Sequence, residues 1–175
     1  MAPPKKTFFH SEELKLWERR VIYFYLTISI LLCILYLNSD WHLRKNILVG
    51  YGIGTQLSLF FVLYTSLRNL KSYLIWCCFG FFHLAVYFTL KNDPDLQMPS
   101  GNAATCLRNT IVLILLFQVL RYISLKLQHR EFVAPAYGGG KDLFENKKVG
   151  FIDFLIFILY YGSLFVLFFL SLDQQ

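Results

Sequence analysis

The chain has 175 residues, of which 56% are hydrophobic and 16% are charged, against roughly 45–50% and 25% in soluble domains. A soluble fold of this length could not bury so much apolar surface, so the composition excludes a soluble globular protein and favours one bundle in lipid. The net charge of +6 does not indicate nucleic-acid binding, because the basic residues flank the apolar segments. At those positions they attract anionic head groups and set the orientation in the membrane.

The first twenty residues are predicted to form a cytoplasmic arm. Within it we expect a short interfacial helix over 10–20, capped by Ser11, with two glutamates in its first turn. The apolar run that follows ends without a small-residue cleavage site, so it is expected to remain as a signal anchor.

Five apolar segments then fill most of the chain. A helix needs about 20 apolar residues to cross a bilayer. We therefore expect an all-α, polytopic membrane helix bundle forming one domain, with spans at 21–37, 47–67, 72–90, 103–125 and 150–172. A cytoplasmic loop is expected over 126–149 and a short tail over 173–175.

The fourth segment is the weakest of the five predictions. Only 12 residues separate Arg108 from Arg121, which is about 18 Å of helix. Both arginines can extend outwards to the membrane surfaces, and one long helix would then cross. The alternative is a re-entrant or surface-lying segment, which would leave four spans.

The distribution of Lys and Arg predicts the topology. With a cytoplasmic N-terminus and five crossings, thirteen of the 17 basic residues lie in the cytoplasm and four on the other side. Six of those thirteen follow the fourth segment, so a re-entrant fourth segment would reverse the bias. The positive-inside rule therefore favours five crossings, with the C-terminus on the opposite side.

Glycines of the second segment are candidates for helix packing. Gly50 and Gly54 are four residues apart and share one helix face, a spacing that lets two helices approach closely. The same glycines do not indicate a nucleotide loop, because no strand–turn–helix unit surrounds them.

His83 lies near the middle of the third segment. An ionisable residue at this depth is a candidate functional residue, because its charge is costly in lipid. No Asp, Glu or second His lies at comparable depth, so a hydrogen bond between helices is favoured over catalysis or transport.

Charged and neutral polar residues near the helix ends are the remaining site candidates. Asp153 could pair with Arg121 at the cytoplasmic ends of two helices, or it could cap its own helix. Arg108 marks the opposite end of the fourth segment. Neutral polar side chains within the spans are suited to holding helices together, or to lining a path for lipid head groups: Thr55, Gln56, Ser58 and Gln118.

Motifs that would indicate an enzyme are missing from the sequence. The GGGK run at 138–141 fails the phosphate-loop pattern, because Pro135 and Asp142 occupy required positions. We expect this loop to be a flexible cytoplasmic contact surface with two basic and three aromatic residues: Lys147, Lys148, Phe132, Tyr137 and Phe144. The four cysteines have no metal or redox spacing; Cys77 and Cys78 are expected to be packing residues, with acylation as the alternative. No catalytic residue, cofactor or metal is expected.

The leading hypothesis is a non-enzymatic accessory subunit of a larger membrane complex. Its expected partners are other integral membrane proteins and membrane lipids, not nucleic acid. A lipid-handling protein, such as a scramblase or a lipid guide, is the alternative, and a small channel or transporter is a third. Short spans rich in Phe favour the endoplasmic reticulum, with a lumenal C-terminus, over the plasma membrane.

Overall fold

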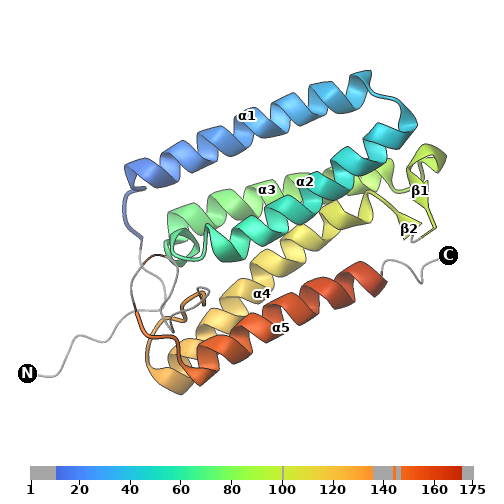
Figure 1. The fold of residues 1–175 in the computed structure, drawn as a ribbon. Coiled ribbons are helices and arrows are strands. Elements are labelled where there is room, and N and C mark those ends of the chain that lie inside the picture. Colours follow the sequence, from blue (N-terminus) through green and yellow to red (C-terminus); the bar gives the residue numbers. More distant parts are fainter. Residues whose placement is uncertain (1–10, 100, 136–143, 145–146, 171–175) are drawn as a thin grey trace, which may run out of the picture.

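Five α-helices make up most of the chain in the computed structural model, which describes residues 11–99, 101–135, 144 and 147–170. The helices are α1 (Leu16–Asn38), α2 (Trp41–Phe61), α3 (Leu70–Leu90), α4 (Thr105–Gln128) and α5 (Phe151–Leu170). Successive helices run in opposite directions (Figure 1). The starts of α1, α3 and α5 therefore lie at one end of the bundle, which we call the N-terminal end.

The predicted fold class is confirmed: the chain is an all-α helix bundle of the membrane-protein type. Four helices, α1, α3, α4 and α5, are long and apolar enough to cross a membrane. The fourth segment, predicted at 103–125, is one continuous helix of 24 residues and is among these four.

The second helix differs most from its prediction. The hydropathy pattern predicts it at 47–67, but α2 begins at Trp41, because the carboxylate of Asp40 accepts the N–H of Leu43 at 3.0 Å and caps the helix. Its first turn therefore contains Arg44, and it is not among the four helices that meet the length and apolarity required for a span. After Phe61 the chain passes through a short 3-10 helix, Ser66–Arg68, before α3.

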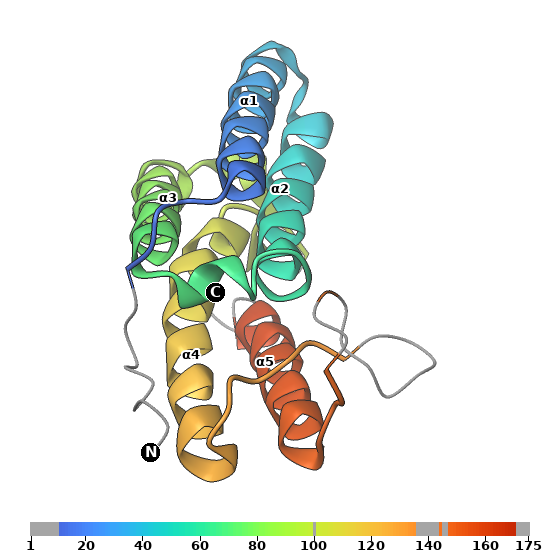
Figure 2. The same ribbon diagram turned by 90° about the vertical axis from the view of Figure 1, so that its left-hand side faces the viewer.

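α4 is the centre of the bundle. It packs against α2, α3 and α5, and half of its residues are buried. The main core forms around it from large apolar side chains of α2, α4 and α5, which include Phe60, Phe117 and Tyr160. Figure 2, a view along the helices, shows α4 between α3 and α5.

α1 begins later than the predicted interfacial helix. Residues 11–15 have no regular structure, and α1 runs without a break from Leu16 to Asn38. Glu18 fixes this start, because its carboxylate accepts the backbone N–H of Lys15 at 2.7 Å. The prediction that Ser11 caps a separate helix is therefore wrong.

The connection between α3 and α4 is ordered. It contains a 3-10 turn, Pro94–Leu96, and two short strands, β1 (Gln97–Met98) and β2 (Gly101–Asn102), paired antiparallel. Gly101 has a φ of 98°, which few residues other than glycine adopt, and so permits the tight turn. Leu96 is buried in a second, smaller core.

The segment that follows α4 does not lie on the surface. His129 ends the helix in the left-handed conformation (φ 54°), and residues 130–135 turn back beside α4 (Figure 2). Phe132, Val133 and Ala134 are fully buried, and the ring of Phe132 stacks on Phe60 with centroids 5.9 Å apart. The prediction that Phe132 lies on an exposed contact surface is therefore wrong, while residues 136–143 of the predicted loop lie outside the described residues.

Candidate functional site

A buried polar cluster surrounds His83 in the middle of the bundle. The imidazole Nε2 lies 2.9 Å from the hydroxyl of Tyr25 on α1, and Nδ1 lies 3.1 Å from the hydroxyl of Thr110 on α4. His83 itself is only 1% exposed. Both ring nitrogens thus have hydroxyl partners from neighbouring helices, which are the contacts that the hydrogen-bonding interpretation of His83 expects.

The cluster extends along α1 and α2. The Tyr25 hydroxyl also lies 3.1 Å from that of Thr55, and the hydroxyls of Ser29 and Tyr51 are 2.6 Å apart. Neither tyrosine was among the site residues predicted from the sequence. A signal was present, because Tyr25 and Ser29 on α1, like Tyr51 and Thr55 on α2, are polar pairs four residues apart on one helix face.

A second polar region lies at the N-terminal end of the bundle. Arg121 of α4 is 1% exposed and donates three hydrogen bonds to the Glu131 carboxylate, from Nε to Oε1 at 3.1 Å and to Oε2 at 2.9 Å, and from Nη2 to Oε1 at 2.7 Å. Its Nη1 also donates to Gln118 at 3.3 Å. The prediction that Arg121 extends to the membrane surface is wrong, because Glu131 on the returning segment pairs with it inside the bundle.

Asp153 is fully buried and does not pair with Arg121. The predicted ion pair between Asp153 and Arg121 is therefore wrong. Asp153 accepts the backbone N–H of Gly150 at 2.8 Å, just before α5, so the capping alternative is confirmed. It also forms an ion pair with Arg130 and accepts a hydrogen bond from Gln128 at 2.8 Å. One carboxylate therefore fixes the start of α5 to the end of α4.

A further arginine holds the returning segment from the other side. Arg68, which is buried after α2, donates from Nη2 to the carbonyl of Phe132 at 2.7 Å. Together with the Glu131 and Asp153 contacts, this bond keeps residues 130–135 within the core. These contacts form a polar layer at the N-terminal end.

The two predicted packing glycines lie on the exposed side of α2. Nothing lies within 4 Å of the position that a Cβ would take at Gly50 or Gly54. The close approach occurs instead at Gly52, where an added Cβ would lie 2.8 Å from Cβ of Cys106 on α4. The prediction that Gly50 and Gly54 bring two helices together is therefore wrong for the described helices of this chain. Their packing against a helix of a partner protein remains a prediction.

Arg108 lies at the other end of α4 and is half-buried. Its guanidinium lies over the ring of Tyr87, 5.6 Å from the centroid. Cys78 is exposed on α3 and Cys77 is half-buried beside it.

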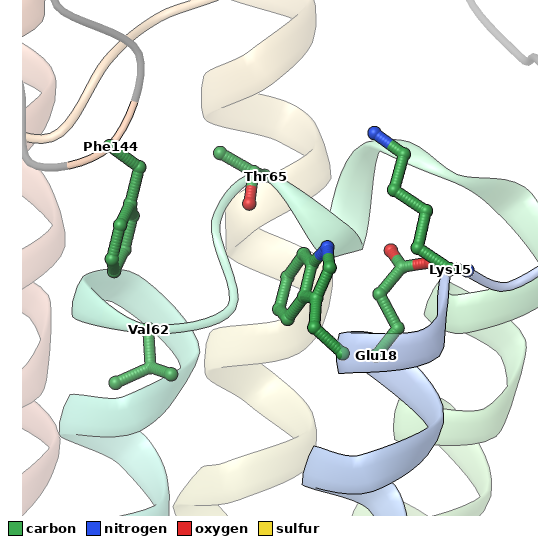
Figure 3. A pocket seen from close by; sticks show the side chains of 6 residues that line it. Lys15, Glu18, Val62, Thr65 and Phe144 are labelled. Atoms are coloured by element: carbon green, nitrogen blue, oxygen red, sulfur yellow. The ribbon is translucent and has the colours of Figure 1, made fainter.

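A cavity of about 460 Å³ opens at the N-terminal end, beside the start of α1. It is lined by Lys15, Trp17, Glu18, Val62, Thr65 and Phe144. Figure 3 shows Phe144 and Val62 on one side of this cavity and Lys15 and Glu18 on the other, with Thr65 between the two sides. Within the described residues, no group of three His, Cys, Asp or Glu side chains could hold a metal ion.

The fold and these clusters define the class: a multi-pass, all-α membrane protein with clusters of buried polar groups inside the bundle. No model of a known protein family matches the chain, and the comparisons with curated proteins and with solved structures found no match either. The function is therefore inferred from the chain's own residues.

Proposed function

We propose that this protein is a non-enzymatic accessory subunit of a larger integral membrane complex, in which it packs against transmembrane helices of its partners. The observation that carries the proposal is the exposure of α1. Among its residues only Glu18 is buried, although the helix has 23 residues. A helix that makes few contacts within its own chain is available to contact another one.

The exposed glycines of α2 support the same proposal. Interfaces between membrane helices are enriched in small residues, because these let two backbones approach closely. Gly50 and Gly54 leave such a shallow face open, and no atom of the described chain fills it. We propose this face, together with α1, as the surface that a partner helix covers.

The test is purification of the tagged protein from its own cells in a mild detergent, followed by sizing and mass spectrometry. A defined particle far above 20.6 kDa is expected. The double variant Gly50→Leu with Gly54→Leu should lose that particle while the chain itself stays folded. Gly162→Leu is the matched control, because Gly162 on α5 is equally open. A homogeneous monomer from the unaltered protein would contradict the proposal.

Lipid handling is a second candidate function, supported by the cavity beside α1, which combines charged and apolar lining groups. If the chain moves lipid by itself, purified protein in liposomes should accelerate lipid exchange between leaflets. Arg108→Leu should slow this exchange, because Arg108 is the half-buried cation at the far end of α4. Absence of acceleration would remove autonomous lipid movement and leave the accessory role.

A further inference from the structure

The cavity beside α1 lies at the level expected for lipid head groups. The uncharged apolar run of α1 begins at Val21. Lys15 lies six residues before it, which is about 9 Å along a helix. Trp17 lies between them, and indole rings concentrate at this level of a bilayer. Ten of the basic residues that the positive-inside rule assigns to the cytoplasm are among the described residues, and they lie at this same end of the bundle.

One side of the cavity is polar. The side chain of Lys15 is exposed, and its ammonium forms no ion pair with another described residue. Thr65 adds a hydroxyl group. Glu18 is buried, and its Oε2 already accepts the N–H of Lys15, so its carboxylate serves the start of α1. The cavity therefore offers one available cation and one hydroxyl donor, which suits a phosphate group.

The other side of the cavity is apolar. Val62 and Phe144 are exposed there, at 41% and 60%, although both are large hydrophobic side chains. The ring of Phe144 stacks on the buried ring of Tyr64, with centroids 5.8 Å apart and planes 22° apart. This stacking holds an aromatic face towards the cavity, on the side opposite Lys15 (Figure 3).

The size of the cavity limits what it can hold. Its volume of about 460 Å³ lies within the usual range of ligand sites, which is about 300–1,000 Å³. A complete phospholipid is larger than this. The head group and glycerol region would fill the cavity, and the acyl chains would continue into the bilayer along the exposed apolar residues of α1.

We propose that this cavity binds one glycerophospholipid of the cytoplasmic leaflet, with the phosphate at Lys15 and Thr65 and the upper acyl chain against Val62 and Phe144. The inference deepens the lipid-handling candidate and does not need the partner proteins of the accessory role. A lipid held here would lie between the start of α1 and the end of α2, where it would connect the peripheral helix to the rest of the bundle.

The test is native mass spectrometry of the delipidated full-length protein with added phosphatidylglycerol, and with diacylglycerol of the same acyl chains. Lys15→Gln should weaken phosphatidylglycerol binding about tenfold, the size of one charge-assisted hydrogen bond. Lys45→Gln is the matched control: Lys45 also lies beside a tryptophan, Trp41, but at the opposite end of the bundle. That variant should bind as the unaltered protein does.

Two results would overturn the inference. One is equal binding by the Lys15→Gln and Lys45→Gln variants, and the other is binding of diacylglycerol as tight as that of phosphatidylglycerol. Val62→Trp, which fills the apolar side, should also abolish binding while Lys15 is kept. A protein that binds the lipid but purifies as a monomer would keep this inference and remove the accessory role. A protein that binds the lipid without exchanging it between leaflets would remove only autonomous lipid movement.

Discussion

α1 and α4 are nearly equal in length, and both are apolar enough to cross a membrane, yet they occupy opposite positions in the bundle. In the most apolar stretch of α1, 6% of the residues are buried, against 44% for α4. This difference in burial correlates with the polar residues of the two helices and not with their apolar residues. α4 carries Asn109, Thr110, Arg121 and Ser124, all buried, whereas α1 makes its main polar contacts through Tyr25 and Ser29.

This contrast shows which property of a helix places it at the centre of a membrane bundle. In lipid, apolar side chains gain little by being buried, while polar groups must find partners inside the protein. The helix with the most polar groups at depth is therefore drawn to the centre. The same contrast makes α1 the best candidate for contact with a partner or a lipid.

The largest effect is expected from breaking the buried ion pair of α4. Glu131→Gln should lower the free energy of unfolding by about 3 kcal/mol, because it removes the negative charge that pairs with the buried Arg121 guanidinium. The measurement is the thermal midpoint of the purified protein in detergent. Glu13→Gln, an exposed residue just before α1, is the matched control and should change stability by less than about 0.5 kcal/mol. Similar midpoints for the two variants would contradict the central role of α4.

A smaller effect is expected where α2 meets α4. Gly52→Ala should cost about 2 kcal/mol, because the added methyl group would collide with Cys106 and its backbone. Gly50→Ala and Gly54→Ala should be neutral or stabilising by up to about 1 kcal/mol, since alanine favours helix and nothing lies nearby. The thermal midpoints of the three single variants would measure these differences in stability. If Gly50→Ala proved as damaging as Gly52→Ala, the observed rotation of α2 would be wrong.

The smallest effect is expected for the attachment of α1. Tyr25→Phe removes the hydroxyl that contacts both His83 and Thr55, and should cost about 1 kcal/mol. Tyr23→Phe is the control, because Tyr23 is 68% exposed on the same helix. Denaturation of both variants in detergent micelles would compare them. A loss as large for Tyr23→Phe would show that α1 is held through another face.

Hydropathy and charge predicted the membrane class, the all-α fold and the existence of five helices, because these depend on local composition. Capping was also readable in part: Asp153 was weighed as a cap, whereas Asp40, whose cap moved the start of α2, was missed. Both signals lie within a few residues of the helix they start. The start of α2 could therefore have been found from the sequence.

The candidate site was less predictable. His83 was identified because an ionisable residue in an apolar helix is conspicuous, but its partners Tyr25 and Thr110 come from helices 58 and 27 residues away. Arg121 was predicted to lie at the surface. Its pairing with Glu131 could not be predicted, because it depends on the return of residues 130–135 into the core. The cavity combines Lys15, Thr65 and Phe144, which no sequence pattern connects.

The sequence by itself thus determined that the chain enters a membrane as a helix bundle and which residues are costly to leave in lipid. The tertiary structure alone decided which helix is central, which face each helix presents, and whether Gly52 or the pair Gly50 and Gly54 meets a neighbour. The physical reason is that these helices are apolar on nearly every side. Their rotation is therefore set by polar partners and small residues on other helices, and not by their own periodicity.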